Sequence, residues 1–180
     1  SCAIMQEMQM AFLEEDKDLT ETCEKDCDIL VLTPSYPSNH NLYLAAFAHS
    51  RNRVYAEKGM KIQVASLASH LWYQTSYDFE GIPVITGHTS LLKKLLAKKQ
   101  YKVIITHFVD VEYYQIFDGY VTNEQLMFVC HGPETTFELL PNVARPYFTA
   151  PVPNEYGKNP VKRQYVKKYA LKKNVHWVFV

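Results

Sequence analysis

Histidine side chains end two apolar segments of the sequence. His107 follows YKVIIT and His131 follows LMFVC, so each lies where a buried strand would stop. Histidine is a common acid–base catalyst because an imidazole ordinarily changes its charge close to neutral pH. Gly132 comes next after His131 and would let the backbone approach a ligand closely. We therefore predict that His131 is a catalytic residue; a histidine held only by structural hydrogen bonds is the alternative.

Further polar residues occupy equivalent places after predicted strands. In proteins with parallel strands, ligands bind in the crevice at the carboxyl ends of the strands. Residues 34–41, 107–110 and 131–134 all follow such ends, so we expect them to converge on one crevice. The substrate-binding candidates are Ser38, Asn39, His40, Asn41, His107, Asp110, Gly132 and Glu134. Two of them have structural alternatives, because His107 could orient its loop through a backbone hydrogen bond and Asp110 could cap a helix.

Alternating strands and helices are expected to position these residues. Strands are predicted at residues 29–32, 61–67, 82–85, 101–106, 126–130 and 175–180, and helices at residues 42–59, 89–99, 110–117 and 159–173. The first strand is apolar throughout, which is typical of a strand covered on both faces. The strand that contains Pro83 is expected at an edge of the sheet. This alternation predicts an α/β fold with a doubly wound, mostly parallel sheet and helices on both faces.

The first helix is predicted to follow the polar loop directly. It is expected to begin at Leu42, with Asn39 or Asn41 as its N-cap, and to end at Gly59. Its unpaired N–H groups would then suit a ligand bound at the loop. The apolar spacing predicts an inward stripe of Leu42, Ala45, Ala46, His49, Arg53 and Ala56.

Several motifs that define common proteins of this class are absent. The loop after the first strand contains no glycine, which excludes the glycine-rich dinucleotide fingerprint there, and neither a Walker motif nor G-x-S-x-G occurs. Thr33 and Pro34 stand where a receiver domain would need an acidic residue. Cys23 and Cys27 are separated by three residues rather than two and no second pair follows, which argues against zinc. We expect reduced thiols and no metal or other cofactor.

The composition is that of a folded globular domain. The chain has 180 residues, 47% of them hydrophobic. No apolar run approaches the roughly 20 residues that span a bilayer, and no cleavable leader is evident, so we expect a soluble cytoplasmic protein. Residues 28–180 are predicted to form the domain, and the acidic residues 1–27 a linker or a packing helix.

A basic segment lies near the end of the chain. Residues 158–173 contain seven basic side chains and no acidic one. Helical spacing puts Val161, Tyr165, Val166, Tyr169 and Ala170 on an inward stripe, so Lys162, Arg163 and the later lysines are expected to project elsewhere. We predict that Lys167, Lys168, Lys172 and Lys173 contact an anionic lipid surface or a phosphate-bearing acceptor. A solvated helix face is the alternative.

Five segments, in their order along the chain, resemble the N-terminal half of a family 4 retaining glycosyltransferase with the GT-B fold. They are ILVLTPSYPSN, YAEKGMKIQVASL, YDFEGIPVI, YKVIITHFVD and FVCHGPE. The resemblance covers residues 28–180 and implies a Rossmann-like domain that holds the acceptor, while a second domain binds the nucleotide sugar without a metal. It also implies that His131 touches the donor sugar or its phosphate. The first loop departs from the family, because residues 38–41 replace a glycine pair that many members carry.

Two functions remain open. The first is the acceptor-binding half of a glycosyltransferase that acts on a glycan or a lipid-linked acceptor. This half is expected to be inactive alone, because the chain stops in an apolar strand at Val180, before any donor-binding domain. A lipid-linked acceptor would also imply a peripheral place on the inner membrane leaflet. The second is a non-catalytic Rossmann-like interaction module, whose histidines are structural. A nucleic-acid partner is not expected, and a following domain with a pair of glutamates would favour the transferase.

Overall fold

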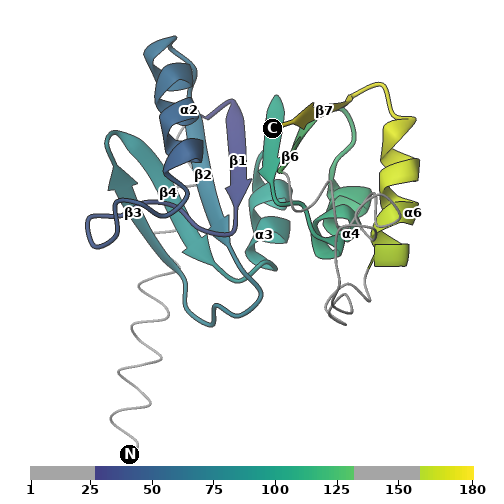
Figure 1. The fold of residues 1–180 in the computed structure, drawn as a ribbon, viewed down its shortest axis with the longest axis horizontal. Coiled ribbons are helices and arrows are strands. Elements are labelled where there is room, and N and C mark those ends of the chain that lie inside the picture. Colours follow the sequence, from purple (N-terminus) through teal and green to yellow (C-terminus); the bar gives the residue numbers. More distant parts are fainter. Residues whose placement is uncertain (1–26, 132–158) are drawn as a thin grey trace, which may run out of the picture. The chain divides into compact units, whose positions relative to one another are not determined.

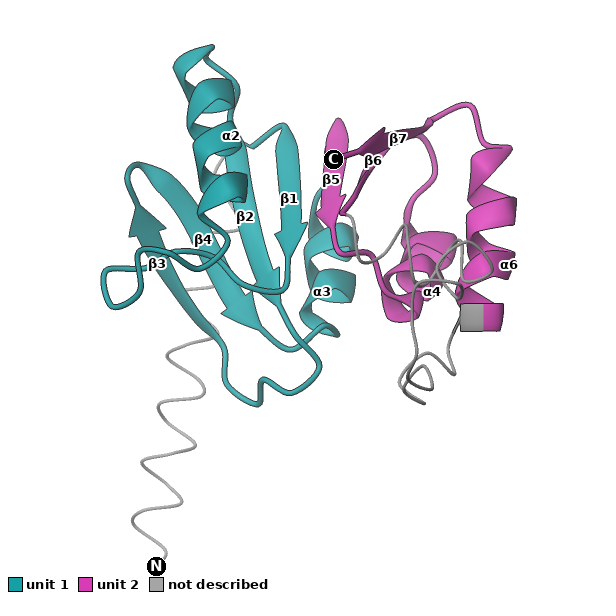
Figure 2. Cartoon of the chain, in the orientation of Figure 1, with its two compact units in different colours: residues 1–101 teal, residues 102–180 magenta. Residues whose placement is uncertain are grey.

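The computed structural model describes residues 27–131 and 159–180, which fall into two compact units, residues 1–101 and residues 102–180 (Figure 2). The predicted acidic linker or packing helix lies almost wholly outside the described residues. In the described ranges no helix is both long enough and apolar enough to cross a membrane.

Unit 1 contains four neighbouring strands of the sheet in the order β3-β4-β2-β1, which can be followed in Figure 1. Its strands are β1 (Ile29–Thr33), β2 (Ile62–Leu67), β3 (Thr75–Phe79) and β4 (Ile82–Gly87). β1 pairs with β2, and β2 with β4, in parallel. Every residue of β1 and β2 is buried, as the apolar run in β1 predicts for a strand covered on both faces.

The outermost strand of this sheet, β3, is antiparallel to β4 and was not predicted. The two strands are joined by Glu80 and Gly81, with φ of 49° and 81°, the positive values of a type I′ hairpin turn. The prediction that the Pro83 strand lies at an edge is therefore wrong, because β4 lies between β2 and β3. Proline is tolerated there because the pairing of β4 with β2 begins only at Val84.

Helix α2 (Ala46–Glu57) begins four residues later than predicted. Ala45 adopts a left-handed conformation with φ of 48°, which breaks the helix before that point, and no side chain caps it. The predicted caps Asn39 and Asn41 are therefore wrong. The predicted stripe is also largely wrong, since the buried residues of α2 are Ala48, His49 and Asn52. By contrast, α3 (Leu91–Lys98) buries Leu91, Leu92 and Leu95 much as its spacing predicts.

Unit 2 contains three parallel strands, β5 (Val103–His107), β6 (Gln125–Cys130) and β7 (Val175–Phe179), in that order. Its helices are α4 (Val111–Tyr120) and α6 (Asn159–Ala170). Aromatic rings join these elements: Tyr114 of α4 stacks on Tyr165 of α6 with parallel rings, and Phe128 of β6 packs against Trp177 of β7. The α/β class with a mostly parallel sheet and alternating helices is thus confirmed.

The hairpin turn provides a test of this backbone. Replacing Gly81 with Ala should lower the free energy of unfolding by about 1 kcal/mol, because an alanine disfavours the φ of 81° found there. Gly119 is the matched control, since it lies in α4 with open space around it. Gly119→Ala should raise stability by up to about 1 kcal/mol. Urea unfolding measures both, and a loss at Gly119 or none at Gly81 would contradict this backbone.

Candidate functional site

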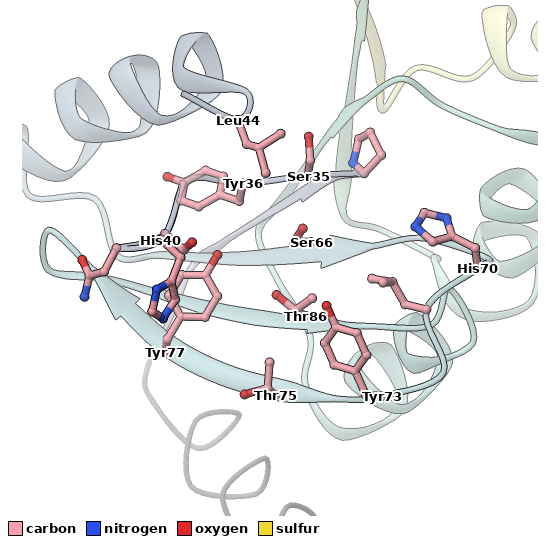
Figure 3. Close-up of a pocket in the computed structure, with 14 residues that line it drawn as sticks. Ser35, Tyr36, His40, Leu44, Ser66, His70, Tyr73, Thr75, Tyr77 and Thr86 are labelled. Carbon is pink, nitrogen blue, oxygen red and sulfur yellow. The ribbon is translucent and has the colours of Figure 1, made fainter. Parts of the chain in front are cut away.

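A cavity of about 520 Å³ lies at the carboxyl ends of the parallel strands of unit 1 (Figure 3). Its volume is within the usual range for small-molecule pockets. Pro34 begins its wall directly after β1, Ser66 comes from the end of β2, and Thr86 comes from the end of β4. The remaining lining residues among the described parts of the chain also belong to unit 1.

Hydroxyl groups and aromatic rings dominate the pocket lining. The hydroxyl-bearing residues are Ser35, Ser38, Ser66, Thr75, Thr86, Tyr36, Tyr73 and Tyr77. The others are Pro34, Asn39, His40, Leu44, His70 and Leu71. Among these lining residues there is no aspartate, glutamate, lysine or arginine. Because hydroxyls can both donate and accept hydrogen bonds, the pocket suits an uncharged ligand rich in polar groups.

The loop between β1 and α2 is held against the sheet by hydrogen bonds from several sides. Tyr77 Oη donates to the carbonyl oxygen of Pro37 at 3.0 Å. Burial raises the pKa of Tyr77, against the opposing effect of a hydrogen bond with Thr86, so the hydroxyl stays protonated and able to donate. Within the loop, Ser38 and Asn41 exchange two backbone hydrogen bonds of 3.0 Å. The wall is therefore shaped by specific polar contacts.

Three of the four loop residues predicted to bind substrate line this pocket, namely Ser38, Asn39 and His40. Asn41 is not among the lining residues, and its side-chain oxygen instead accepts a hydrogen bond from the backbone of Tyr43 at 3.3 Å. The opposite wall, formed by residues 70–77, was not predicted. The alternation of TSYDF before Gly81 was a signal for that strand, because a glycine in a short connection between two strand-like segments is typical of a hairpin turn.

Behind the pocket, Tyr36 anchors the loop to α2. The Tyr36 side chain is buried and its ring lines the cavity, while its hydroxyl lies 2.9 Å from His49 Nδ1. Asn52 Nδ2 donates to the same hydroxyl at 3.1 Å. His49 Nε2 lies 3.0 Å from a carboxylate oxygen of Glu80 in the hairpin turn. This network connects the loop, α2 and the β3–β4 hairpin.

The two histidines predicted from the strand ends do meet in unit 2. His107 Nδ1 and His131 Nε2 are 3.1 Å apart, which is a hydrogen-bonding distance. The Phe108 ring stacks on the His131 ring with centroids 4.2 Å apart. Phe108 has φ of 54°, a conformation that costs roughly 1–2 kcal/mol in a bulky residue. Such local strain at a pair of titratable side chains is compatible with a functional site.

Of the other residues predicted to bind substrate in this region, one caps a helix and two lie outside the described residues. Asp110 caps α4, since its side chain accepts a hydrogen bond from the Val111 backbone at 2.6 Å. Gly132 and Glu134 lie outside the described residues. Convergence of residues 34–41 with residues 107–110 and 131–134 involves both units and stays a prediction.

Metal binding has no candidate in the described ranges. There, no group of three or more histidine, cysteine, aspartate or glutamate side chains could hold an ion. Cys27 and Cys130 are buried and take part in no disulfide. Cys2 and Cys23 lie outside the described residues, so the expectation of a metal-free protein stays a prediction.

The basic helix α6 differs from its predicted pattern. Lys162 was expected to project outward but is buried, while Val161 of the predicted inward stripe is exposed. Lys168 Nζ lies 2.6 Å from Asp118 of α4, and Lys172 Nζ lies 4.0 Å from the same carboxylate. Burial acts to raise the pKa of Asp118, but hydrogen bonds from Lys168 and Tyr169 outweigh this effect and hold the pKa below its usual value. Of the four predicted lysines, Lys168 and Lys172 therefore lie close to a carboxylate, while Lys167 and Lys173 are exposed.

Comparison with known proteins gives no family assignment: neither models of protein families nor the curated proteins match this chain.

The loop anchor at Tyr77 can be tested by removing one oxygen. Tyr77→Phe should lower the free energy of unfolding by about 1 kcal/mol, because the Pro37 carbonyl loses its donor. Tyr43→Phe is the control, since Tyr43 is 87% exposed, and it should change stability by less than about 0.5 kcal/mol. Thermal or urea unfolding measures the difference, and equal effects of the two substitutions would show that the anchor is not stabilising.

Proposed function

We propose that the chain is the acceptor-binding half of a glycosyltransferase that moves a sugar from a nucleotide sugar to a glycan or lipid-linked acceptor. The α/β fold with mostly parallel strands is compatible with the Rossmann-like domains of the enzymes that the sequence resembles. The proposal requires a second domain of the same polypeptide to bind the nucleotide sugar. The chain alone is then inactive, because transfer needs both substrates held in one orientation.

The observation that carries this proposal is the chemistry of the pocket. A sugar offers hydroxyls that donate and accept hydrogen bonds, together with apolar C–H faces. In the pocket, Ser66, Thr75 and Thr86 offer hydroxyl groups that can hydrogen-bond to the sugar hydroxyls. The aromatic rings of Tyr73 and Tyr77 can pack against the C–H faces of the sugar. The described lining lacks fixed charge, which favours a neutral saccharide over a phosphate at this position.

In this proposal His131 is the catalytic residue of the chain and faces the donor. A hydrogen-bond donor aimed at charge that develops on a phosphate lowers the barrier. His107 holds the His131 ring through the 3.1 Å contact, and Phe108 supports it by stacking. Neither His107 nor His131 binds a metal in the proposed reaction.

A second candidate, the non-catalytic interaction module, is favoured by a different observation. Four large apolar or aromatic side chains are exposed in the turn before α2 and in its first turn, namely Leu42, Tyr43, Leu44 and Phe47. Contiguous exposed apolar side chains are typical of surfaces that meet a partner. Under this hypothesis the pocket would bind no sugar.

Saccharide binding separates the two candidates. We expect neutral mono- and disaccharides such as glucose, N-acetylglucosamine and maltose to bind the chain, and Tyr73→Ala to weaken binding about tenfold through loss of a stacking ring. Tyr120→Ala is a matched control, because Tyr120 in α4 is 41% exposed and Tyr73 is 42% exposed. Saturation-transfer NMR and calorimetry measure the affinities. Absence of binding, or equal losses in both variants, would contradict a sugar pocket.

We also propose that α6 and the turn after it, residues 171–174, give the domain a peripheral contact with the inner membrane leaflet. Each lysine near an anionic surface contributes on the order of 1 kcal/mol. Lys167 and Lys173 are exposed, whereas Lys168 and Lys172 lie against Asp118, so the first pair is the better placed for lipid. A lipid-linked acceptor would lie at such a surface.

This contact predicts a local effect of charge. Replacing Lys167 and Lys173 with Gln should weaken binding to vesicles of phosphatidylserine and phosphatidylcholine at least tenfold, because about 2 kcal/mol is lost. Replacing the exposed Lys93 and Lys94 of α3 with Gln removes the same charge and should have little effect. Co-sedimentation at low salt measures both. Equal weakening by both pairs, or no binding of the unmodified chain, would leave α6 as a solvated helix face.

A further inference from the structure

His49 is a buried histidine that contacts three separate segments of unit 1. It belongs to α2, lies beside Tyr36 of the pocket loop and reaches Glu80 in the turn between β3 and β4. The ring of Phe79 packs edge-on against it, with centroids 4.7 Å apart. A change in the hydrogen bonds of His49 therefore acts on the loop that lines the pocket.

The positions of the hydrogens in this network follow from its geometry. Tyr36 Oη accepts a hydrogen bond from Asn52 Nδ2 at 3.1 Å. Burial raises the pKa of Tyr36 to about 12, so the hydroxyl keeps its hydrogen at neutral pH. That hydrogen is donated to His49 Nδ1, 2.9 Å away. The neutral His49 ring then carries its own hydrogen on Nε2, which donates to Glu80 at 3.0 Å.

A second proton on His49 disrupts this arrangement. In the imidazolium form both ring nitrogens are donors. Tyr36 Oη would then face two donors, His49 Nδ1 and Asn52 Nδ2, and the hydroxyl hydrogen would lose its acceptor. The Tyr36 oxygen can accept a hydrogen bond from each of them, but its own hydrogen, a buried donor, then has no acceptor in this network. Leaving a buried donor unpaired is unfavourable, so the anchor of the loop is weakened.

The charged groups around His49 oppose one another. The Glu80 carboxylate favours the imidazolium, whereas Arg53 Nη1 lies 3.4 Å from the same carboxylate and weakens its effect. Arg53 also forms an ion pair with Glu57 of the same helix, in which Nη2 of Arg53 lies 3.8 Å from Oε1 of Glu57. Tyr77, which is close to Tyr36, is neutral with a raised pKa.

We propose that His49 is a positioning residue for the pocket: its neutral Nε2–H form holds Tyr36 and the loop in place, and protonation of His49 releases them. The pocket is then formed at pH 8 and loosened at pH 5. The proposal concerns the wall of the cavity, so it holds whether the ligand is a sugar or another neutral molecule.

Hydrogen exchange of the loop amides tests this proposal on the 180-residue chain without any ligand. The amides of Ser38 and Asn41 form the backbone hydrogen bonds of the loop. We expect their protection factors, corrected for the intrinsic pH dependence of exchange, to fall roughly fivefold to tenfold between pH 8 and pH 5. The amides of β1 and β2 should keep their protection.

Three variants make the result specific to the network. His49→Gln has no proton to gain in this range, so loop protection should no longer depend on pH. Tyr36→Phe keeps the ring but lacks the hydroxyl, and should give low protection at both pH values. His176→Gln removes an exposed histidine of β7 and should retain the pH dependence of the unmodified chain.

Two further outcomes would overturn the proposal. Nitrogen-15 NMR reports the tautomer of His49 directly, and an Nδ1–H tautomer at pH 8 would contradict the hydrogen positions on which the proposal depends. A pH dependence that persists in His49→Gln would assign it to another group. Both measurements remain decisive even if Tyr36→Phe fails to fold.

Discussion

Parallel pairing of β1 with β2 is the constraint on which unit 1 depends. Both strands are buried along their whole length, and each fully buried large apolar side chain contributes roughly 1.5–3 kcal/mol. Because the strands are parallel, their carboxyl ends lie at the same edge, and the segments that leave them must meet there. Ser35 and Ser66 are thereby brought into one cavity although they are distant in sequence. The pocket is a consequence of the strand direction as much as of its own residues.

Polar contacts then decide the shape of that cavity. The loop after β1 has few apolar side chains to bury, so it depends on hydrogen bonds whose loss exposes unpaired groups to a buried environment. Tyr77 reaches the loop from β3, and Tyr36 connects it to His49 and Asn52 of α2. Both tyrosines serve twice, because their rings line the pocket while their hydroxyls fix its wall. Binding surface and structural support are therefore the same residues.

Unit 2 is stabilised in a different way. Tyr114, Phe128 and Tyr169 form an aromatic cluster between α4, β6 and α6, and Asp118 joins the two helices through Tyr169 and Lys168. This ion pair neutralises part of the positive charge of α6, although Lys168 stays exposed. At the end of β5, the strained backbone of Phe108 puts its ring on His131. The histidine pair is thus held by neighbours that local sequence patterns do not reveal.

Sequence alone determined the α/β class, the buried first strand, the apolar face of α3 and the meeting of His107 with His131, because these follow from local periodicity and strand direction. Of the loop residues predicted to bind substrate, Ser38, Asn39 and His40 line the pocket. Only the tertiary structure decided the start of α2, the central place of β4, the opposite pocket wall and the burial of Lys162. These features depend on contacts between segments far apart in sequence. The sequence around Ala45 is compatible with many loop conformations, so it does not reveal where α2 begins. A lysine on a helix is buried or exposed according to what packs beside it. Periodicity reports which residues share a face, whereas the neighbours of that face are fixed only when the chain folds.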